Sequence, residues 1–201
     1  MNSNFLFVET RALLVVSIFL MVSFFIANNI PAATITGFFV ILFLLKFRDP
    51  DRVIPSDPLA VVSPVDGRVE RIERLQHPYF GSGAIRIVID INALGAYVLR
   101  SPTEGKLIEM PARLPVQARR LRGFNVCTDE DDNVVFLLQG PWYAPPAASK
   151  RVGERIGQGE RCGVLRLAHQ AEVLLPATSH IRCVQGEQLL AGESILGHFV
   201  H

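Results

Sequence analysis

The chain has 201 residues, 49% of them hydrophobic, and its formal net charge of +1 is close to neutral. That balance excludes binding of nucleic acid through a strongly basic surface. The 3 cysteines show neither paired metal-ligand spacing nor a disulfide framework, so we expect buried, reduced thiols and no metal site.

The apolar excess is concentrated near the start of the chain. Between Arg11 and Lys46 lie 34 residues without a charge, which as one helix would run about 50 Å, well beyond a hydrocarbon core of about 30 Å. Pro31 divides the run, so we predict two α-helices, 12–27 and 32–45, that form a membrane hairpin. The hairpin either crosses the bilayer as a pair of transmembrane helices or dips in and returns. A cleaved signal peptide is the alternative, but the run lacks a clear small-residue cleavage site.

Both ends of this hairpin emerge on one side of the membrane, and basic residues flank it there. Such residues favour the cytoplasmic side, so we predict a membrane-anchoring hairpin over 1–46 and a domain facing the cytoplasm over 47–201. A second arginine cluster lies at 111–124, where contact with anionic lipid and a solvated strand face are alternatives. The candidates for membrane contact are Lys46, Arg48, Arg52, Arg113, Arg119, Arg120 and Arg122.

The remainder of the chain consists of short apolar runs punctuated by glycine and proline, without a long segment of helical periodicity. This pattern predicts a mainly β domain, with strands at 85–91, 134–138 and 172–175. The acidic stretch 129–133 is typical of a solvated hairpin tip. Trp142-Tyr143 forms either an interfacial aromatic patch or a packed loop.

Two internal echoes divide this domain into related parts. Residues 63–69 (SPVDGRV) match 101–107 (SPTEGKL), and residues 153–160 match 186–193 at glycine and apolar positions. We therefore predict two hairpin-rich halves packed as a small barrel or sandwich. Lipoyl and biotinyl carrier domains carry such repeats too, but Lys106 lacks the flanking methionines of a carrier motif.

Four blocks carry a family resemblance, in order along the chain. They are 47–52, 63–69, 91–102 and 159–176. Together, and after a double apolar segment, they resemble the short, membrane-anchored bacterial phosphatidylserine decarboxylases and the related archaetidylserine enzymes. The resemblance implies the family's β fold, a role in phospholipid metabolism and a bacterial cytoplasmic (inner) membrane location.

The last block departs from the family at the position that matters most for its chemistry. Family members carry Gly-Ser where this chain has Ala168-His169. In the family the serine hydroxyl attacks the preceding carbonyl carbon, the chain is cut, and the serine becomes the pyruvoyl group that accepts electrons during decarboxylation. The imidazole of His169 has no hydroxyl for the first step, and Ala168 adds a Cβ where a positive φ would favour glycine. The resemblance therefore implies that no pyruvoyl cofactor forms.

Three further positions follow from the same resemblance. Tyr97 replaces a family histidine implicated in acid and base chemistry, and a tyrosine is a poor base at neutral pH. Asp66 matches a carboxylate that assists self-cleavage, and Arg100 matches the family's basic residue. An Asx-type turn at Asp66 and a surface ion pair at Arg100 are the plain structural alternatives.

We therefore predict a pseudoenzyme, an uncut family member whose domain binds an aminophospholipid, a lipid-metabolism protein or a second copy of itself. One alternative is an active decarboxylase that converts phosphatidylserine to phosphatidylethanolamine after cleavage at a relocated serine, Ser179 or Ser194. Another is a membrane-anchored scaffold or assembly protein.

Overall fold

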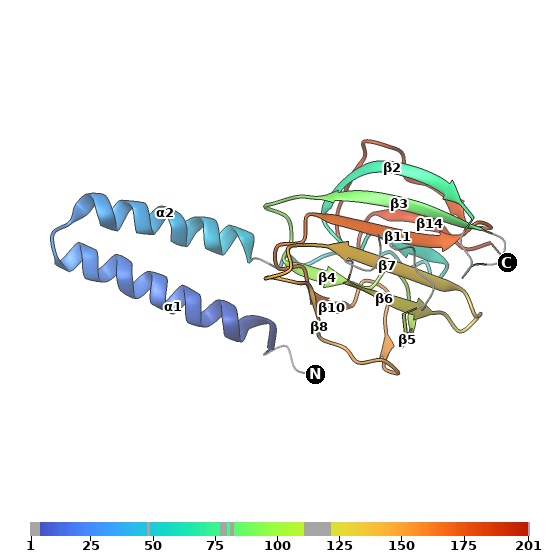
Figure 1. Ribbon diagram of the computed structural model, residues 1–201, viewed down its shortest axis with the longest axis horizontal. Coiled ribbons are helices and arrows are strands. Elements are labelled where there is room, and N and C mark those ends of the chain that lie inside the picture. The colour runs from blue at the N-terminus through green and yellow to red at the C-terminus, as the bar shows by residue number, and fades with distance from the viewer. Residues whose placement is uncertain (1–4, 48, 77–79, 81–82, 111–121, 201) are drawn as a thin grey trace. The chain divides into compact units, whose positions relative to one another are not determined.

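The chain forms two compact units, Met1–Asp49 and Pro50–His201, which are described separately (Figure 1). The computed structural model describes residues 5–47, 49–76, 80, 83–110 and 122–200. The first unit is helical and the second is built of antiparallel sheets. The prediction of a mainly β chain that begins with two helices is confirmed.

The helical unit contains α1 (Phe5–Ile26) and α2 (Ile30–Lys46). Asn29 caps α2, because its Oδ1 accepts a hydrogen bond from the N–H of Ala32 at 3.3 Å. Pro31 falls in the first turn of α2, where its missing N–H costs no hydrogen bond. Both helices are therefore longer than predicted, and Pro31 belongs to the second helix instead of only separating the two.

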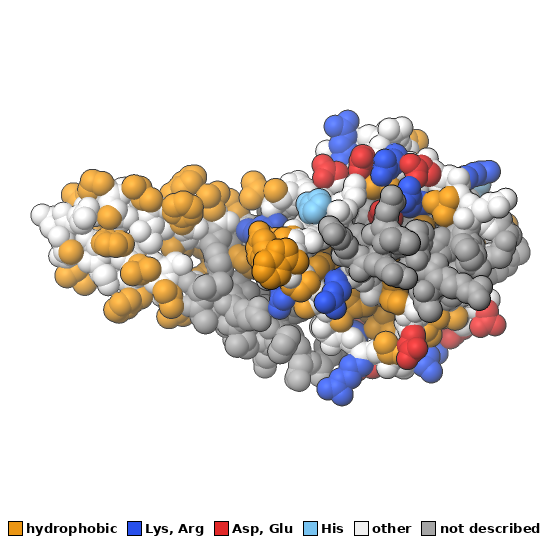
Figure 2. Space-filling view, viewed as in Figure 1, with side chains coloured by type: hydrophobic (Ala, Val, Ile, Leu, Met, Phe, Trp, Pro, Cys, Tyr) orange, Lys and Arg blue, Asp and Glu red, His pale blue; other side chains and the backbone are white. Residues whose placement is uncertain are grey.

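Large apolar side chains are exposed on both helices, among them Phe19 at 70% and Phe25 at 72%. Figure 2 shows hydrophobic side chains spread over the surface of this unit. Among the described residues, however, neither helix is both long enough and apolar enough to span a bilayer. The structure does not support the expected pair of transmembrane helices.

The β unit contains three sheets in which every pair of neighbouring strands is antiparallel. The strand orders are β1-β14-β12, β4-β10-β8 and β13-β2-β3-β11-β7-β6-β5-β9. The strands are β1 (Ala60–Val62), β2 (Gly67–Leu75), β3 (Ala84–Ile91), β4 (Val98–Arg100), β5 (Gly105–Ile108), β6 (Arg122–Cys127), β7 (Asn133–Gln139), β8 (Ala147–Ala148), β9 (Arg155–Ile156), β10 (Arg161–Val164), β11 (Gln170–Pro176), β12 (His180–Ile181), β13 (Gln188–Leu189) and β14 (Ile195–His198).

The three strands predicted from the sequence correspond to β3, β7 and β11, which lie at the centre of the large sheet. On β3, Ile85, Ile87, Ile89 and Ile91 all enter the main core, as their alternation predicts. The acidic stretch forms the turn between β6 and β7, so the predicted hairpin tip is also confirmed.

The other face of the large sheet carries charged pairs beside a small second apolar cluster. Arg86 bonds Glu73 on the neighbouring strand β2 and lies 3.7 Å from Glu172 on β11. Burial raises the pKa of the Glu172 carboxyl, and the positive charge of Arg86 opposes that rise. The small cluster of Val135, Leu137 and Leu174 continues this face across β7 and β11.

The two segments of the first echo, 63–69 and 101–107, form equivalent hydrogen bonds in the structure. The hydroxyl of Ser63 donates to the carbonyl of Val65 at 2.7 Å, and that of Ser101 donates to the carbonyl of Thr103 at 2.7 Å. The two turns also bind each other reciprocally. The N–H of Val62 donates to Pro102 O at 2.8 Å, and the N–H of Arg100 donates to Pro64 O at 3.0 Å.

The second echo completes each half of the domain. The N–H of Val69 donates to Glu187 O at 2.9 Å, and in the equivalent place the N–H of Leu107 donates to Glu154 O at 2.9 Å. One half therefore combines 63–69 with 186–193, and the other combines 101–107 with 153–160. The predicted pair of related halves is present, with each half assembled from segments far apart in the sequence.

Candidate functional site at the start of the central strand

The position of the altered residue pair is the start of β11, where three strands of the large sheet come together. β3 ends at Ile91, β7 ends at Gln139, and β11 begins at Gln170 between them (Figure 1). The N–H of His169 donates to Gln139 O at 3.0 Å, and the carbonyl of His169 accepts from the N–H of Ile91 at 2.8 Å. Backbone hydrogen bonds therefore hold His169 on both sides.

A tight turn leads into this junction. The N–H of Ala168 donates to Leu165 O at 2.9 Å, and Arg166 within the turn has a positive φ of 51°. Ala168 is buried, and it is not among the residues of positive φ in the described chain. The expected strain at Ala168 is therefore absent, because the turn places the left-handed residue two positions earlier. The side chain of His169 is exposed.

Asp66 is the most heavily bonded side chain near this junction. Its carboxylate accepts two hydrogen bonds from Arg52 Nη2, at 3.0 and 2.8 Å. It also accepts from the N–H of Ala96 at 2.8 Å and from the N–H of Ala191 at 2.7 Å. Asp66 is 5% exposed. The ion pair with Arg52 and the two backbone hydrogen bonds offset the free-energy cost of burying its charge. This is more than an Asx-type turn, because the bonds join three distant segments.

Tyr97 connects the loop after β3 to the turn before the altered pair. Its carbonyl accepts from the N–H of Leu165 at 3.0 Å, and its side chain is half-buried. The carbonyl of Asp66 accepts from the N–H of Asn92 at 3.0 Å, next to the residue that bonds His169. The structure therefore brings Asp66, Tyr97, Ala168 and His169 to one end of the large sheet.

Arg100 lies in the interior and not on the surface, where its plain structural alternative placed it. It is 5% exposed, and its guanidinium donates to Gly159 O at 3.1 Å and to Pro50 O at 3.2 Å. Gly192 gives it room, because a Cβ there would lie 2.7 Å from Arg100 Cδ. A buried guanidinium that bonds backbone carbonyls fixes the path of the chain at both places.

The residues predicted to contact the membrane occupy different environments. Lys46 is the last residue of α2, and Arg122 is exposed at the start of β6. Arg52 has only 11% of its side chain exposed and pairs with Asp66, so its guanidinium is engaged inside the domain. The other four candidates, Arg48, Arg113, Arg119 and Arg120, lie outside the described residues.

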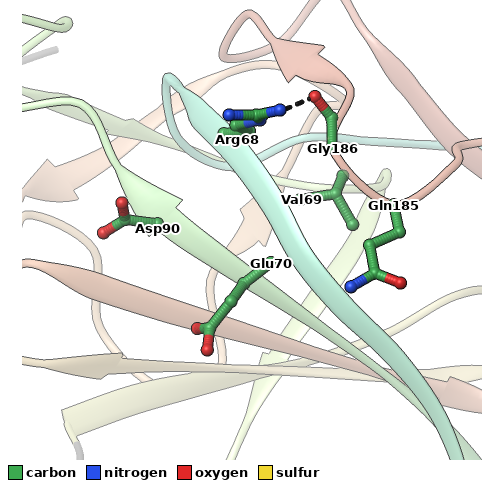
Figure 3. A pocket seen from close by; sticks show the side chains of 6 residues that line it. All are labelled: Arg68, Val69, Glu70, Asp90, Gln185 and Gly186. Atoms are coloured by element: carbon green, nitrogen blue, oxygen red, sulfur yellow. Dashed lines mark hydrogen bonds between the residues drawn. The ribbon is translucent and has the colours of Figure 1, made fainter.

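A pocket of about 360 Å³ with charged lining residues, which no sequence motif predicted, lies on the outer face of β2 and β3 (Figure 3). Arg68, Glu70 and Asp90 supply its charges, and Gln185 and Gly186 close one side. Arg68 Nε donates to Gly186 O at 2.8 Å, as the dashed line in Figure 3 marks. The sequence signal nearest to it was the run of charged residues along β2, which is equally typical of a solvated strand face.

The donor set at the junction does not fit the cofactor implied by the resemblance. That group is made from a hydroxyl-bearing residue of the chain itself, whereas residue 169 is a histidine. The backbone N–H and carbonyl of His169 are hydrogen-bonded to the neighbouring strands. Among the described residues, no cluster of three His, Cys, Asp or Glu side chains is placed to hold a metal ion.

These features define a class of protein: an antiparallel β domain of two repeated halves, joined to an apolar helical pair, with a buried acid beside the start of its central strand. The sequence profile of the family described as phosphatidylserine decarboxylase matches residues 39–197. The chain therefore belongs to the phosphatidylserine decarboxylase family, which is a family of phospholipid metabolism.

Individual relatives agree with this assignment over most of their length. A phosphatidylserine decarboxylase proenzyme of Cupriavidus pinatubonensis is 30% identical over 171 residues, covering 78% of this chain and 78% of the relative. One from Chlorobaculum tepidum is 27% identical over 207 residues, covering 94% of each. One from Chlorobium phaeobacteroides is 26% identical over 168 residues, covering 77% of this chain and 78% of the relative.

Proposed function

We propose that this chain is an uncut, pyruvoyl-free member of the family that serves phospholipid metabolism by binding instead of decarboxylating. In this proposal residues 1–46 anchor the protein in a bacterial cytoplasmic membrane, and residues 47–201 face the cytoplasm. The observation that carries the proposal is His169 at the start of β11, with no hydroxyl on its side chain. Without that oxygen the peptide bond before residue 169 cannot be converted to an ester and broken.

The partners of Asp66 add support. A carboxylate that assists proton transfer must be within hydrogen-bond reach of the proton it takes. Both oxygens of Asp66 instead accept bonds from Arg52 and from backbone amides. This arrangement favours a role in holding the fold together, a role that survives loss of the chemistry. Tyr97, in place of a histidine, removes a second group that titrates near neutral pH.

The polar pocket on β2 and β3 offers a place for the proposed binding. Its two carboxylates and one guanidinium present complementary partners to an ammonium group and to a phosphate or carboxylate. An aminophospholipid headgroup carries such charges together. The same domain surface is available to a lipid-metabolism protein or a second copy of the chain, and binding to lipid vesicles distinguishes the first of these from the other two.

The second candidate is an active decarboxylase with a relocated cleavage site, which the names of the relatives favour. Of the two serines considered, Ser194 is already engaged, because its hydroxyl accepts from the N–H of Leu190 at 2.9 Å. Ser179 is 5% exposed, and its hydroxyl has no hydrogen-bond partner within the described chain. Ser179 follows the far end of β11, however, roughly 20 Å from position 169 at about 3.3 Å per residue.

Intact mass measurement of the purified chain separates the two candidates. We expect one species of 22.3 kDa, whereas the active form would give two fragments, one with a blocked amino end. Lipid vesicles containing phosphatidylserine should release no carbon dioxide above background with the purified chain. Fragments together with carbon dioxide release would overturn the proposal.

Restoring the family residues provides the matched test. In the triple variant Tyr97→His, Ala168→Gly, His169→Ser we expect cleavage between residues 168 and 169. The control Tyr97→His, Ala168→Gly, His169→Ala has the same backbone freedom without the hydroxyl, so it should remain one chain. Cleavage in this control, or in the unaltered protein, would place the reactive hydroxyl elsewhere.

A further inference from the structure

Four large side chains with apolar surface are exposed on the loops around the start of β11. Trp142 is 91% exposed, Tyr143 67%, and Leu94 and Leu167 each 51%. The packed-loop alternative for Trp142-Tyr143 is therefore wrong. The two rings contact each other edge to face, with centroids 5.9 Å apart, and Trp142 remains open to solvent. Exposed apolar groups gathered on one surface mark a contact site.

The three loops that carry these side chains are hydrogen-bonded or packed against one another, and we call their four exposed side chains the loop-end patch. The loop after β3 bonds the turn before β11 through Tyr97 O and Leu165 N, at 3.0 Å. That turn bonds the loop after β7 through Arg166 Nη1 and Pro145 O, at 3.2 Å. A Cβ at Gly140 would lie only 3.3 Å from the Cα of Ala168, so the same loop also packs against the turn.

The chain enters the β unit beside this patch. Arg52, two residues after the unit begins, bonds the Asp66 carboxylate, and the same carboxylate accepts from Ala96 in the loop that carries Leu94. α2 ends at Lys46 and the β unit begins at Pro50. Four residues reach at most about 14 Å when extended. If residues 1–46 anchor the chain in the membrane as proposed above, this short connection limits how far the first residues of the β unit can lie from the lipid.

We infer that the loop-end patch is a second membrane contact, inserted into the interfacial layer of a lipid bilayer. Tryptophan and tyrosine are the residues that favour this layer, where an apolar ring and a polar group are both accommodated. The loop segments 93–97, 140–148 and 165–169 contain no acidic residue, whereas Arg166 carries positive charge. The patch can therefore approach anionic headgroups without like-charge repulsion. This inference rests on the membrane anchoring of residues 1–46 proposed above, and it does not depend on whether the chain decarboxylates.

Trp142 is the single tryptophan of the chain, so its fluorescence reports on the patch alone. The full chain is reconstituted into vesicles of phosphatidylethanolamine and phosphatidylglycerol, with and without doxyl-labelled phosphatidylcholine whose label sits near the headgroups. We expect the labelled lipid to quench the Trp142 emission at least twofold. We also expect aqueous iodide to quench it at least threefold less than in a denatured sample.

The matched control moves the tryptophan to the other end of the same hairpin. In Trp142→Phe, Glu130→Trp the probe lies on the exposed acidic turn that precedes β7, whereas Trp142 follows β7. This probe should be open to iodide and unaffected by the labelled lipid. Equal behaviour of the two probes would overturn the inference. So would a Trp142 shielded from iodide but not quenched by lipid, because a second copy or another protein would then cover the patch.

Discussion

The turns at 63–69 and 101–107 have the same backbone design but different acids. Each begins with a serine that bonds the carbonyl two residues later, and each ends in a glycine that starts a strand. Asp66 in the first turn is buried and accepts four hydrogen bonds, whereas Glu104 in the second is exposed. The repeat therefore specifies the fold, and only one copy of it has acquired a polar centre.

Replacing each of the two acids in turn should give the largest difference in stability between the two turns. Asp66→Ala leaves the Arg52 guanidinium without its carboxylate and two backbone amides without an acceptor. We expect a loss of about 3–5 kcal/mol in the free energy of unfolding. Glu104→Ala should change it by no more than about 0.5 kcal/mol. Chemical denaturation of the full chain measures both, and similar losses would mean that Asp66 is not a structural centre.

The two serines should behave alike, in contrast to the two acids. Ser63→Ala and Ser101→Ala each leave a buried carbonyl without the hydroxyl that bonds it at 2.7 Å. We expect each variant to lose about 1–3 kcal/mol in the free energy of unfolding, and the two losses to agree within about 0.5 kcal/mol. A loss confined to Ser63→Ala would show that the two turns are not equivalent supports.

The smallest expected effect concerns the thiol of Cys127. This residue lies opposite Lys106 in the β5–β6 strand pair. At the equivalent place in the other half, Asp90 lies opposite Arg68. Partial burial, together with Asp131, Asp132 and Asp129, raises the pKa of the Cys127 thiol. A raised pKa leaves less thiolate at neutral pH, so labelling by maleimide should be slow and should increase about tenfold per pH unit from pH 7 to 8.

The matched change for that thiol is Asp131→Asn, because asparagine tolerates the positive φ of 64° at this position. It should lower the thiol pKa and speed labelling about twofold, as measured by mass spectrometry of the labelled peptide. Cys183, whose pKa burial raises to about 11, should remain unlabelled in both proteins. No change in the labelling rate of Cys127 would exclude the acidic turn as a cause.

Several elements were predictable from local pattern. The alternation of isoleucines fixed β3, and the acidic stretch between two apolar runs fixed the β6–β7 turn, because both signals depend on neighbours a few residues apart. The sequence predicted both helices but made them too short. The prediction began the first helix after Arg11, although α1 includes this charged residue. It began the second helix after Pro31, since a proline in the first turn of a helix looks the same in sequence as a proline that ends one.

The sequence by itself determined the family, the two-part repeat and the absence of a hydroxyl at residue 169, because identity and order of residues are sufficient for each. Only the tertiary structure decided which groups meet. It paired Arg52 with Asp66, placed Arg100 in the interior and brought together the loops that carry Leu94, Trp142 and Leu167. These contacts join positions dozens of residues apart, and their geometry depends on how the sheets bring the loops together.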